Sequence, residues 1–138
     1  MLDFTDVNWL AVIVAGVVSF ALGGIWYTAL SKPWMAYTGI TNEAATAGGG
    51  AKMAASYATA FATYLLAVTA LALFMQAGGA SGAVSGLVFG LIAGVGLVAT
   101  TSFNNYMFSM RPLNLYLIDI GYPVTALAVA GIIIGVWQ

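Results

Sequence analysis

The sequence predicts an all-α polytopic membrane protein, a single-domain bundle of four transmembrane helices. Of its 138 residues, 62% are hydrophobic and 5% are charged, whereas about 25% of the residues in a soluble domain are charged. Four apolar stretches, at 8–30, 52–76, 81–107 and 113–137, each supply the ~20 residues that a helix needs to cross ~30 Å of hydrocarbon. Backbone polar groups in lipid must pair within their own segment, and no alternating strand pattern occurs, so these stretches are predicted to be helices.

Composition also excludes several classes of function. Three basic and four acidic residues leave a net charge of -1, which is too little positive charge to bind nucleic acid by neutralising phosphates. The chain has no histidine and no cysteine, so thiol chemistry, the usual zinc sites and haem ligation through imidazole are not available. We therefore predict no cofactor and no metal site. No pair of nucleophile and base is visible, so we assign no catalytic residue and do not expect an enzyme.

The first stretch, 8–30, begins with Asn8 as a candidate helix cap and Trp9 as a marker of the boundary between water and lipid. Trp26 and Tyr27 mark its other boundary. Acidic residues precede it where a secretory signal would carry Lys or Arg, so we expect this stretch to remain as a span. The longest connection, 31–51, follows.

Within that connection, Pro33 is expected to end the first helix, because proline has no amide hydrogen and crowds the preceding turn. Residues 41–47 can form a short surface helix before the glycines at 48–50 interrupt it. The second and third stretches are joined only by the uncharged residues 77–80, which predicts an antiparallel helix pair.

The third stretch carries the clearest packing signal, a row of glycines spaced by four residues. Small residues at this spacing let another transmembrane helix approach closely. At about 100° per residue, Thr101 and Asn105 continue on the side of this row. The row consists of Gly82, Gly86, Gly90 and Gly94.

The fourth stretch contains Asp119, the one acidic residue within the predicted spans, and Pro123 four residues later. Pro123 has no amide hydrogen, so the Asp119 carbonyl is predicted to lose its helical partner. Tyr122 shares the side of Asp119, while the opposite side carries Gly121, Ala128 and Gly135. Two such faces indicate either a central position in the bundle or a subunit interface.

Polar side chains gather in the half of the bundle that holds the long connection, which predicts a polar pocket open toward the cytoplasm. At ~1.5 Å per residue, Asp119 lies roughly 9 to 12 Å inside that boundary. Two roles stay open for it: a hydrogen-bonded clasp between the third and fourth helices, with an asparagine as partner, or a role with a ligand, proton or ion. The candidate ligand-binding residues are Asp119, Asn105, Asn104, Tyr122, Arg111 and Thr101.

Orientation follows from the three basic residues, Lys32, Lys52 and Arg111. All three fall in or next to the connections on one side of the predicted membrane. Because Lys and Arg are enriched in cytoplasmic loops, we expect that side to be cytoplasmic and both termini to lie outside.

Four pieces of the sequence carry a resemblance to a known family: residues 8–12 (NWLAV), 23–27 (GGIWY), 32–35 (KPWM) and 117–122 (LIDIGY). In this order, and over nearly the whole chain, they resemble the family of bacterial membrane proteins catalogued as domain of unknown function 1761. The resemblance implies four spans in a bacterial cytoplasmic membrane and implies no particular activity.

Two functions fit these features. The first is a membrane protein that binds a small molecule or an ion in the cytoplasmic half, with transport as an extension. The second is a structural or accessory subunit that meets a copy of itself, or another membrane protein, within the lipid bilayer. The surfaces for such a partner would be the glycine row (Gly82, Gly86, Gly90, Gly94) or the face of Gly121, Ala128 and Gly135.

Overall fold

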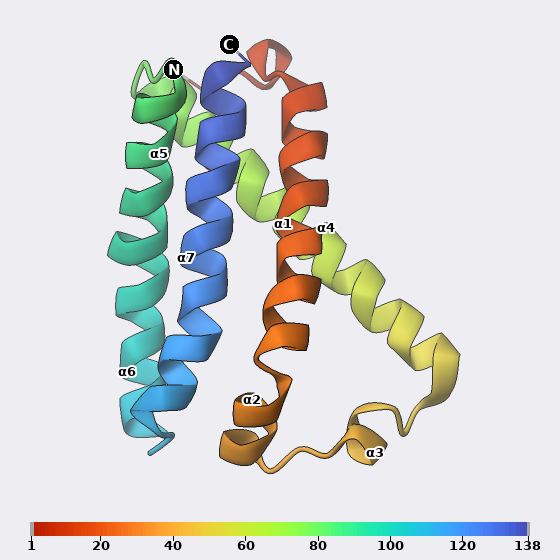
Figure 1. Ribbon diagram of the computed structural model, residues 1–138. Coiled ribbons are helices and arrows are strands. Elements are labelled where there is room, and N and C mark those ends of the chain that lie inside the picture. Colours follow the sequence, from red (N-terminus) through yellow and green to blue (C-terminus); the bar gives the residue numbers. More distant parts are fainter. Residues whose placement is uncertain (1, 138) are drawn as a thin grey trace.

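The computed structural model describes residues 2–137, and within that range it contains helices and no strands. Four helical segments are long and apolar enough to span a membrane (Figure 1): Trp9–Ala29, Gly49–Ala77, Ala83–Phe108 and Leu113–Val136. The predicted fold class is therefore confirmed.

The helical elements follow the chain in a simple order. They are η1 (Phe4–Asp6), α1 (Trp9–Ala29), α2 (Ser31–Thr38), α3 (Asn42–Ala45), α4 (Gly49–Ala77), α5 (Ala83–Leu91), η2 (Ile92–Ala99), α6 (Thr100–Phe108) and α7 (Leu113–Val136). The segments α5, η2 and α6 form one continuous span, and η2 within it is π-helical.

The start of α1 is fixed by the predicted cap. The Asn8 side chain accepts a hydrogen bond from the Ala11 amide at 3.1 Å and donates one to the Trp137 carbonyl at 2.9 Å. Just before it, the hydroxyl and amide of Thr5 donate to the Asp3 carboxylate and lower its pKa. The contact between Asn8 and Trp137 ties the beginning of the chain to the end of its last helix, so both ends lie at the same end of the bundle (Figure 1).

The connection after α1 is more helical than the sequence indicates. Helix α1 ends at Ala29, and after one residue the chain resumes as α2, with Pro33 in the first turn of that helix. Proline is tolerated there because first-turn amides have no helical partner to lose. The short helix α3 lies inside the predicted range 41–47. Helix α2 packs against α7, which brings part of the connection back to the bundle.

Helix α7 lies centrally, between α1 and the span formed by α5, η2 and α6 (Figure 1). The glycine row of the third span faces it. A Cβ added at Gly86 would overlap the Gly131 carbonyl, and one added at Gly90 would overlap the Leu127 carbonyl. The Gly82 amide donates to the Gly135 carbonyl at 2.8 Å. The row thus serves the close packing of two helices of the same chain.

The second predicted contact face is also used within the chain. An added Cβ at Gly121 would overlap the ring of Trp26, and Ala128 and Gly135 lie against the third span. Of the two alternatives for α7, the structure therefore has the central position. Both surfaces named above as candidates for a partner contact helices of this chain.

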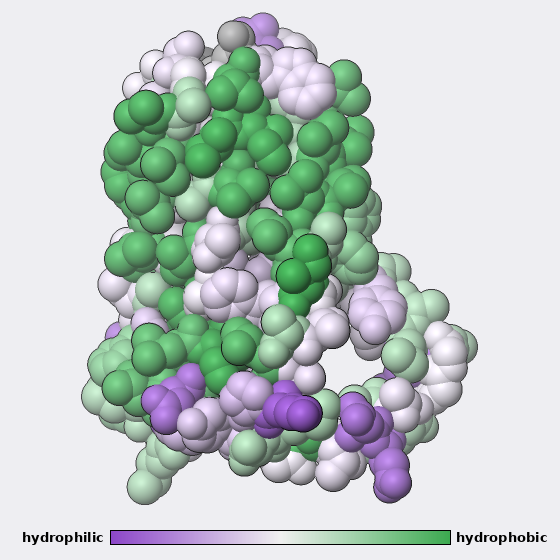
Figure 2. Space-filling model, viewed as in Figure 1, coloured by the Kyte–Doolittle hydropathy of each residue, from purple (hydrophilic) through white to green (hydrophobic). Residues whose placement is uncertain are grey.

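The tightly packed core occupies the half of the bundle near the chain ends. Its largest fully buried side chains include Leu71, Met75 and Ile134. Toward the other end α4 diverges from α1, as Figure 1 shows, and Figure 2 shows that an opening remains there when all atoms are drawn. The hydrophilic residues gather at this end, below a broad hydrophobic belt (Figure 2). We refer to it as the loop end.

Candidate functional site

Asp119, in the loop-end half of α7, is the hydrogen-bonding centre of that half. Its Oδ1 accepts from the Tyr27 hydroxyl at 3.0 Å and from the Trp34 indole N–H at 3.1 Å. Its Oδ2 accepts a short hydrogen bond from the Tyr106 hydroxyl. The three donors come from α1, α2 and α6, so one carboxylate joins four helices.

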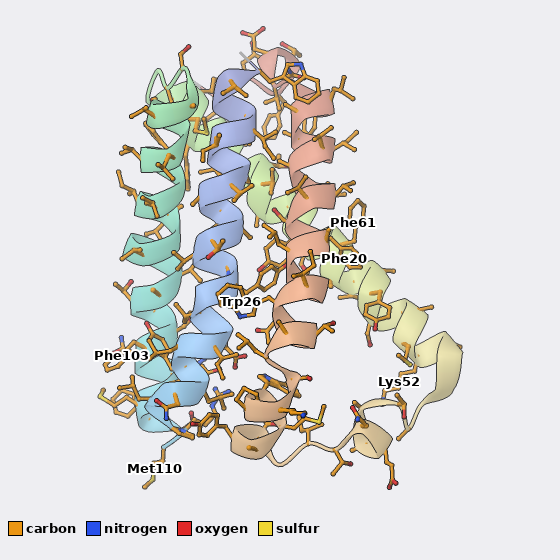
Figure 3. All side chains as sticks on the ribbon, viewed as in Figure 1. Phe20, Trp26, Lys52, Phe61, Phe103 and Met110 are labelled. Carbon is orange, nitrogen blue, oxygen red and sulfur yellow. The ribbon has the colours of Figure 1, made fainter. Side chains whose placement is uncertain are left out.

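Two further side chains bond α1 to α7 beside this centre. The Trp26 indole donates to the Ile118 carbonyl at 2.8 Å, and Figure 3 shows Trp26 between the two helices. The next carbonyl along α7, that of Asp119, is the one for which Pro123 provides no amide hydrogen. The Tyr122 hydroxyl donates to the Ser19 carbonyl at 2.7 Å. Each helix accommodates the other's ring with a glycine, since a Cβ at Gly23 would lie 2.6 Å from the Tyr122 hydroxyl oxygen.

Aromatic rings continue from the carboxylate toward α4. Tyr27 packs edge-on against Trp34, with ring centroids 6.1 Å apart, and against Tyr122 at 5.8 Å. Tyr122 in turn lies 5.0 Å from Tyr64 of α4. A continuous line of rings therefore connects Asp119 to the place where α4 leaves the bundle.

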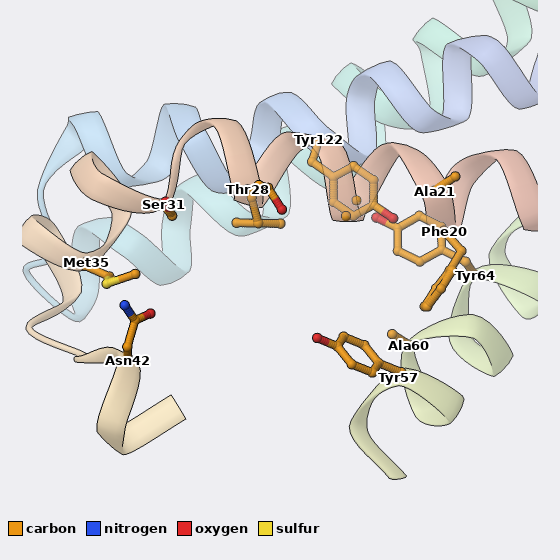
Figure 4. A pocket seen from close by; sticks show the side chains of 13 residues that line it. Phe20, Ala21, Thr28, Ser31, Met35, Asn42, Tyr57, Ala60, Tyr64 and Tyr122 are labelled. Carbon is orange, nitrogen blue, oxygen red and sulfur yellow. The ribbon is translucent and has the colours of Figure 1, made fainter. Parts of the chain in front are cut away.

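That place is a cavity of about 920 Å³ between α1 and α4. Phe20 closes its inner end through edge-on contacts with Tyr57 and Phe61 (Phe20 and Phe61 are labelled in Figure 3). Figure 4 shows Tyr57 and Tyr64 on one side of the space and Tyr122 and Thr28 on the other. Its walls also include Tyr27, Ser31, Met35 and Asn42. The lining is mostly aromatic and aliphatic, with a few hydroxyl and amide groups.

A smaller space of about 460 Å³ adjoins this cavity. It is lined by Asp119 and Trp34 together with three residues that also line the larger cavity, namely Tyr27, Ser31 and Met35. We call the two together the α1/α4 cavity and its Asp119 annex. The annex gives the carboxylate a surface that a molecule in the cavity can approach.

The structure brings only part of the predicted site together. Asp119 and Tyr122 lie at the annex and the cavity, respectively. Arg111 packs its guanidinium 4.0 Å from the centre of the Tyr106 ring, behind the carboxylate cluster. Asn104 and Asn105 are exposed on α6.

Four serine and threonine hydroxyls in the loop-end half, including that of the predicted site residue Thr101, bond within their own helices. Thr101 donates to the Leu97 carbonyl at 2.5 Å, and Thr59 donates to the Ala55 carbonyl at 2.8 Å. Ser56 and Thr63 make the same kind of bond to carbonyls three or four residues earlier. Such hydroxyls need no partner from another helix, and they do not collect around Asp119.

Sequence reasoning missed Tyr27, Trp34 and Tyr106 as partners of Asp119, and expected an asparagine. For Tyr106 the reason is η2. In a π-helical turn each hydrogen bond spans five residues, so such a turn holds about one residue more than an α-helical turn. In an ideal α-helix, Asn105 would lie on the same face as the glycine row. The extra residue in η2 shifts this register by one position, so that Tyr106 lies on that face instead and is buried.

For Tyr27 and Trp34, a signal was available. Both side chains carry a hydrogen-bond donor on a large apolar ring, and their ordinary interpretation is a belt at the lipid boundary. A buried Tyr or Trp usually finds a hydrogen-bond partner, and Asp119 is the one carboxylate within the spans. Pairing these donors with that acceptor would have identified the cluster.

The arrangement holds no metal centre of the usual kind, since residues 2–137 contain no group of three or more Asp, Glu, His or Cys side chains placed to share an ion. What it offers is a space lined by rings, a few neutral polar groups, and one carboxylate at the edge. This is the composition of a site for a small organic molecule, with polar groups that orient a largely apolar body.

These observations define the class of protein: a bundle of four helices that are long and apolar enough to cross a membrane. The chain belongs to the family described as Protein of unknown function (DUF1761), whose sequence pattern matches residues 10–135. The expected family is thus confirmed. No curated protein and no solved structure matches the chain.

Proposed function

We propose that this protein binds a small amphipathic molecule in the α1/α4 cavity, in the loop-end half of the membrane. The observation that carries the proposal is the cavity itself: about 920 Å³ lined mainly by rings and small side chains. Ligand sites in proteins are about 300 to 1,000 Å³ in volume and mostly apolar, with few polar groups. The divergence of α4 leaves this space open toward the hydrocarbon, so a ligand can enter from the bilayer.

Transport of the ligand across the membrane would require a further step beyond binding. The core around Leu71, Met75 and Ile134 is packed between the cavity and the end that carries both termini. Carrying a ligand across would require that core to open, so the arrangement supports binding from one side. We place that side at the cytoplasmic face of a bacterial inner membrane, because Lys32, Lys52 and Arg111 all lie at or near the loop end.

Photolabelling tests the binding proposal. The protein would be reconstituted in vesicles with a neutral aryl diazirine at low mole fraction, and adducts would be mapped by mass spectrometry. We expect labelling concentrated at Tyr57, Tyr64 and Met35. Adducts spread evenly over the exposed apolar residues of the bundle would contradict the proposal.

Two matched variants sharpen this test. Gly24 lines the cavity and Gly96 lies on the third span, and a Cβ at either position would meet no atom within 4 Å. Gly24→Leu is expected to reduce the cavity adducts severalfold by occupying the space, while Gly96→Leu should leave them unchanged. Equal labelling of both variants would count against the cavity as the binding site.

The second candidate, a structural or accessory subunit, is favoured by the same divergence of α4. The loop-end half of α4 has little cover within residues 2–137, and Tyr57 is 57% exposed there. Association through this half would bury it against a second copy or another membrane protein. The native mass of the gently solubilised protein tests this role, and a monomer across the whole concentration range would remove it.

A further inference from the structure

We infer that the ligand of the α1/α4 cavity is a lipophilic organic cation, for which Asp119 in the annex supplies the counter-charge. The inference rests on the proposed function and narrows it to one class of ligand. It combines three features: a carboxyl group whose hydrogen-bond donors are all neutral, the position of this group beside the cavity, and the aromatic rings between them.

The Asp119 side chain accepts hydrogen bonds only from neutral groups, and it retains some bonding capacity. Its three partners, Tyr27, Trp34 and Tyr106, are neutral donors, so they stabilise a negative charge without cancelling it. A carboxylate has about four acceptor positions, and three are taken here. Arg111 is held against the outer face of Tyr106, with its Nε donating to Ser109, and does not count among these donors.

The position of the carboxylate suits a ligand that is long or branched. Tyr27, Ser31 and Met35 line both the cavity and the annex. A molecule whose apolar body fills the cavity can therefore extend one group past Tyr27 toward Asp119. In a low-dielectric site the attraction between such a group and the carboxylate is much stronger than in water.

The aromatic lining favours an organic cation over a metal ion. The faces of Tyr and Trp rings attract cations, and the effect is largest when the cation is weakly hydrated. Tyr27 and Trp34 line the annex itself. A hard metal ion would need several oxygen ligands, and Asp119 is the one carboxylate among the described residues that line the annex.

Equilibrium binding of two isosteric probes tests the inference. Tetraphenylphosphonium is a cation, and tetraphenylsilane has the same shape without the charge. Both would be measured on the full chain in mild detergent, with wild type, Asp119→Asn and Asp6→Asn. The last variant removes a carboxylate at the opposite end of the bundle. We expect tetraphenylphosphonium to bind at least about tenfold more weakly to Asp119→Asn, with Asp6→Asn unchanged.

The neutral probe distinguishes binding in the cavity, which is the proposed function, from a preference for a cation, which is the inference made here. If tetraphenylsilane binds wild type and Asp119→Asn within about twofold, the cavity has survived the substitution, and the loss of the cation is due to charge. If both probes bind both proteins alike, the cavity binds small molecules but the inference of a cation is overturned. If neither probe binds wild type, the proposed function fails with it.

A further variant keeps the inference testable if Asp119→Asn does not fold. Trp34→Phe removes one donor and keeps the carboxylate and an aromatic ring, so tetraphenylphosphonium should still bind in preference to tetraphenylsilane. Wild type alone must also show this preference. Its absence in wild type would overturn the inference whatever the variants do.

Discussion

At the scale of single residues, Asp119 is the clasp of the loop-end half. Leaving a carboxylate in hydrocarbon is costly, and this chain offsets the cost with donors from three other helical segments. The two roles that the sequence leaves open are compatible here. The carboxylate joins the helices through hydrogen bonds, and it also lines the annex, where the proposed ligand would meet it.

Removing one donor should cost stability. Tyr106→Phe deletes the hydroxyl that bonds Oδ2 and preserves the ring that packs against Arg111. We expect a loss of about 1.5 to 3 kcal/mol in the free energy of unfolding, as for other hydrogen bonds to charged groups. The measurement is unfolding by a denaturing detergent, followed by circular dichroism.

The matched control is Tyr37→Phe, which removes an exposed hydrogen bond to Asn114. It should change the free energy of unfolding by less than about 0.5 kcal/mol, as surface substitutions usually do. Equal losses for the two variants would show that the carboxylate cluster is not a special source of stability.

At the scale of elements, glycine decides how closely the third span and α7 approach. The backbones meet at Gly86 and Gly131, and at Gly90 and Leu127, with no room for a side chain between them. In a membrane, such close packing and the contacts it permits are a main source of helix association. The sequence shows the row, but spacing alone does not say whether the neighbour is another helix of the chain or another subunit.

Gly90→Ala and Gly96→Ala should change stability in opposite directions. At Gly90 the new Cβ would overlap the Leu127 carbonyl, and backbone cannot move aside as a flexible side chain can, so we expect a loss of about 1 to 3 kcal/mol. At Gly96 the Cβ meets open space, and alanine should add up to about 1 kcal/mol of helix stability. The same unfolding titration measures both, and destabilisation by Gly96→Ala would contradict this account.

Some elements of this fold can be predicted from the sequence and others cannot. Hydropathy and length locate the four spans, because each depends only on local composition. The π-helical turn η2 and the docking of α2 on α7 depend on contacts between distant segments, so no local pattern reveals them. These two features bring Tyr106 and Trp34 to Asp119 and leave Asn105 outside, which is why the predicted site is only partly recovered.

At the scale of the whole molecule, polarity is unevenly distributed. The core is packed at the end with both termini, while the cavity and the annex lie toward the loop end. Hydrophilic residues also gather at the loop end (Figure 2). Because α4 diverges from α1 only toward the loop end, the bundle has a packed core at one end and a cavity at the other.

The orientation of the bundle can be tested with single cysteines, since the natural chain has none. We expect Glu43→Cys to react with an impermeant maleimide only after intact cells are permeabilised, because the loop end should face the cytoplasm. Asp3→Cys should react from outside without permeabilisation. The opposite pattern of labelling would reverse the orientation and place the cavity in the outer half of the membrane.

The separation of α1 and α4 tests the central claim most directly. Spin labels would be placed on two cysteine pairs. One pair is at Val17 and Leu66, near the contact of Gly16 with Leu65. The other is at Thr28, which lines the cavity, and Ala54, in the loop-end half of α4. Pulsed dipolar spectroscopy of the protein in bilayers would then give both distances. The account predicts a clearly longer distance for Thr28→Cys with Ala54→Cys. Equal distances would mean that the two helices run side by side to the loop end, with no cavity between them.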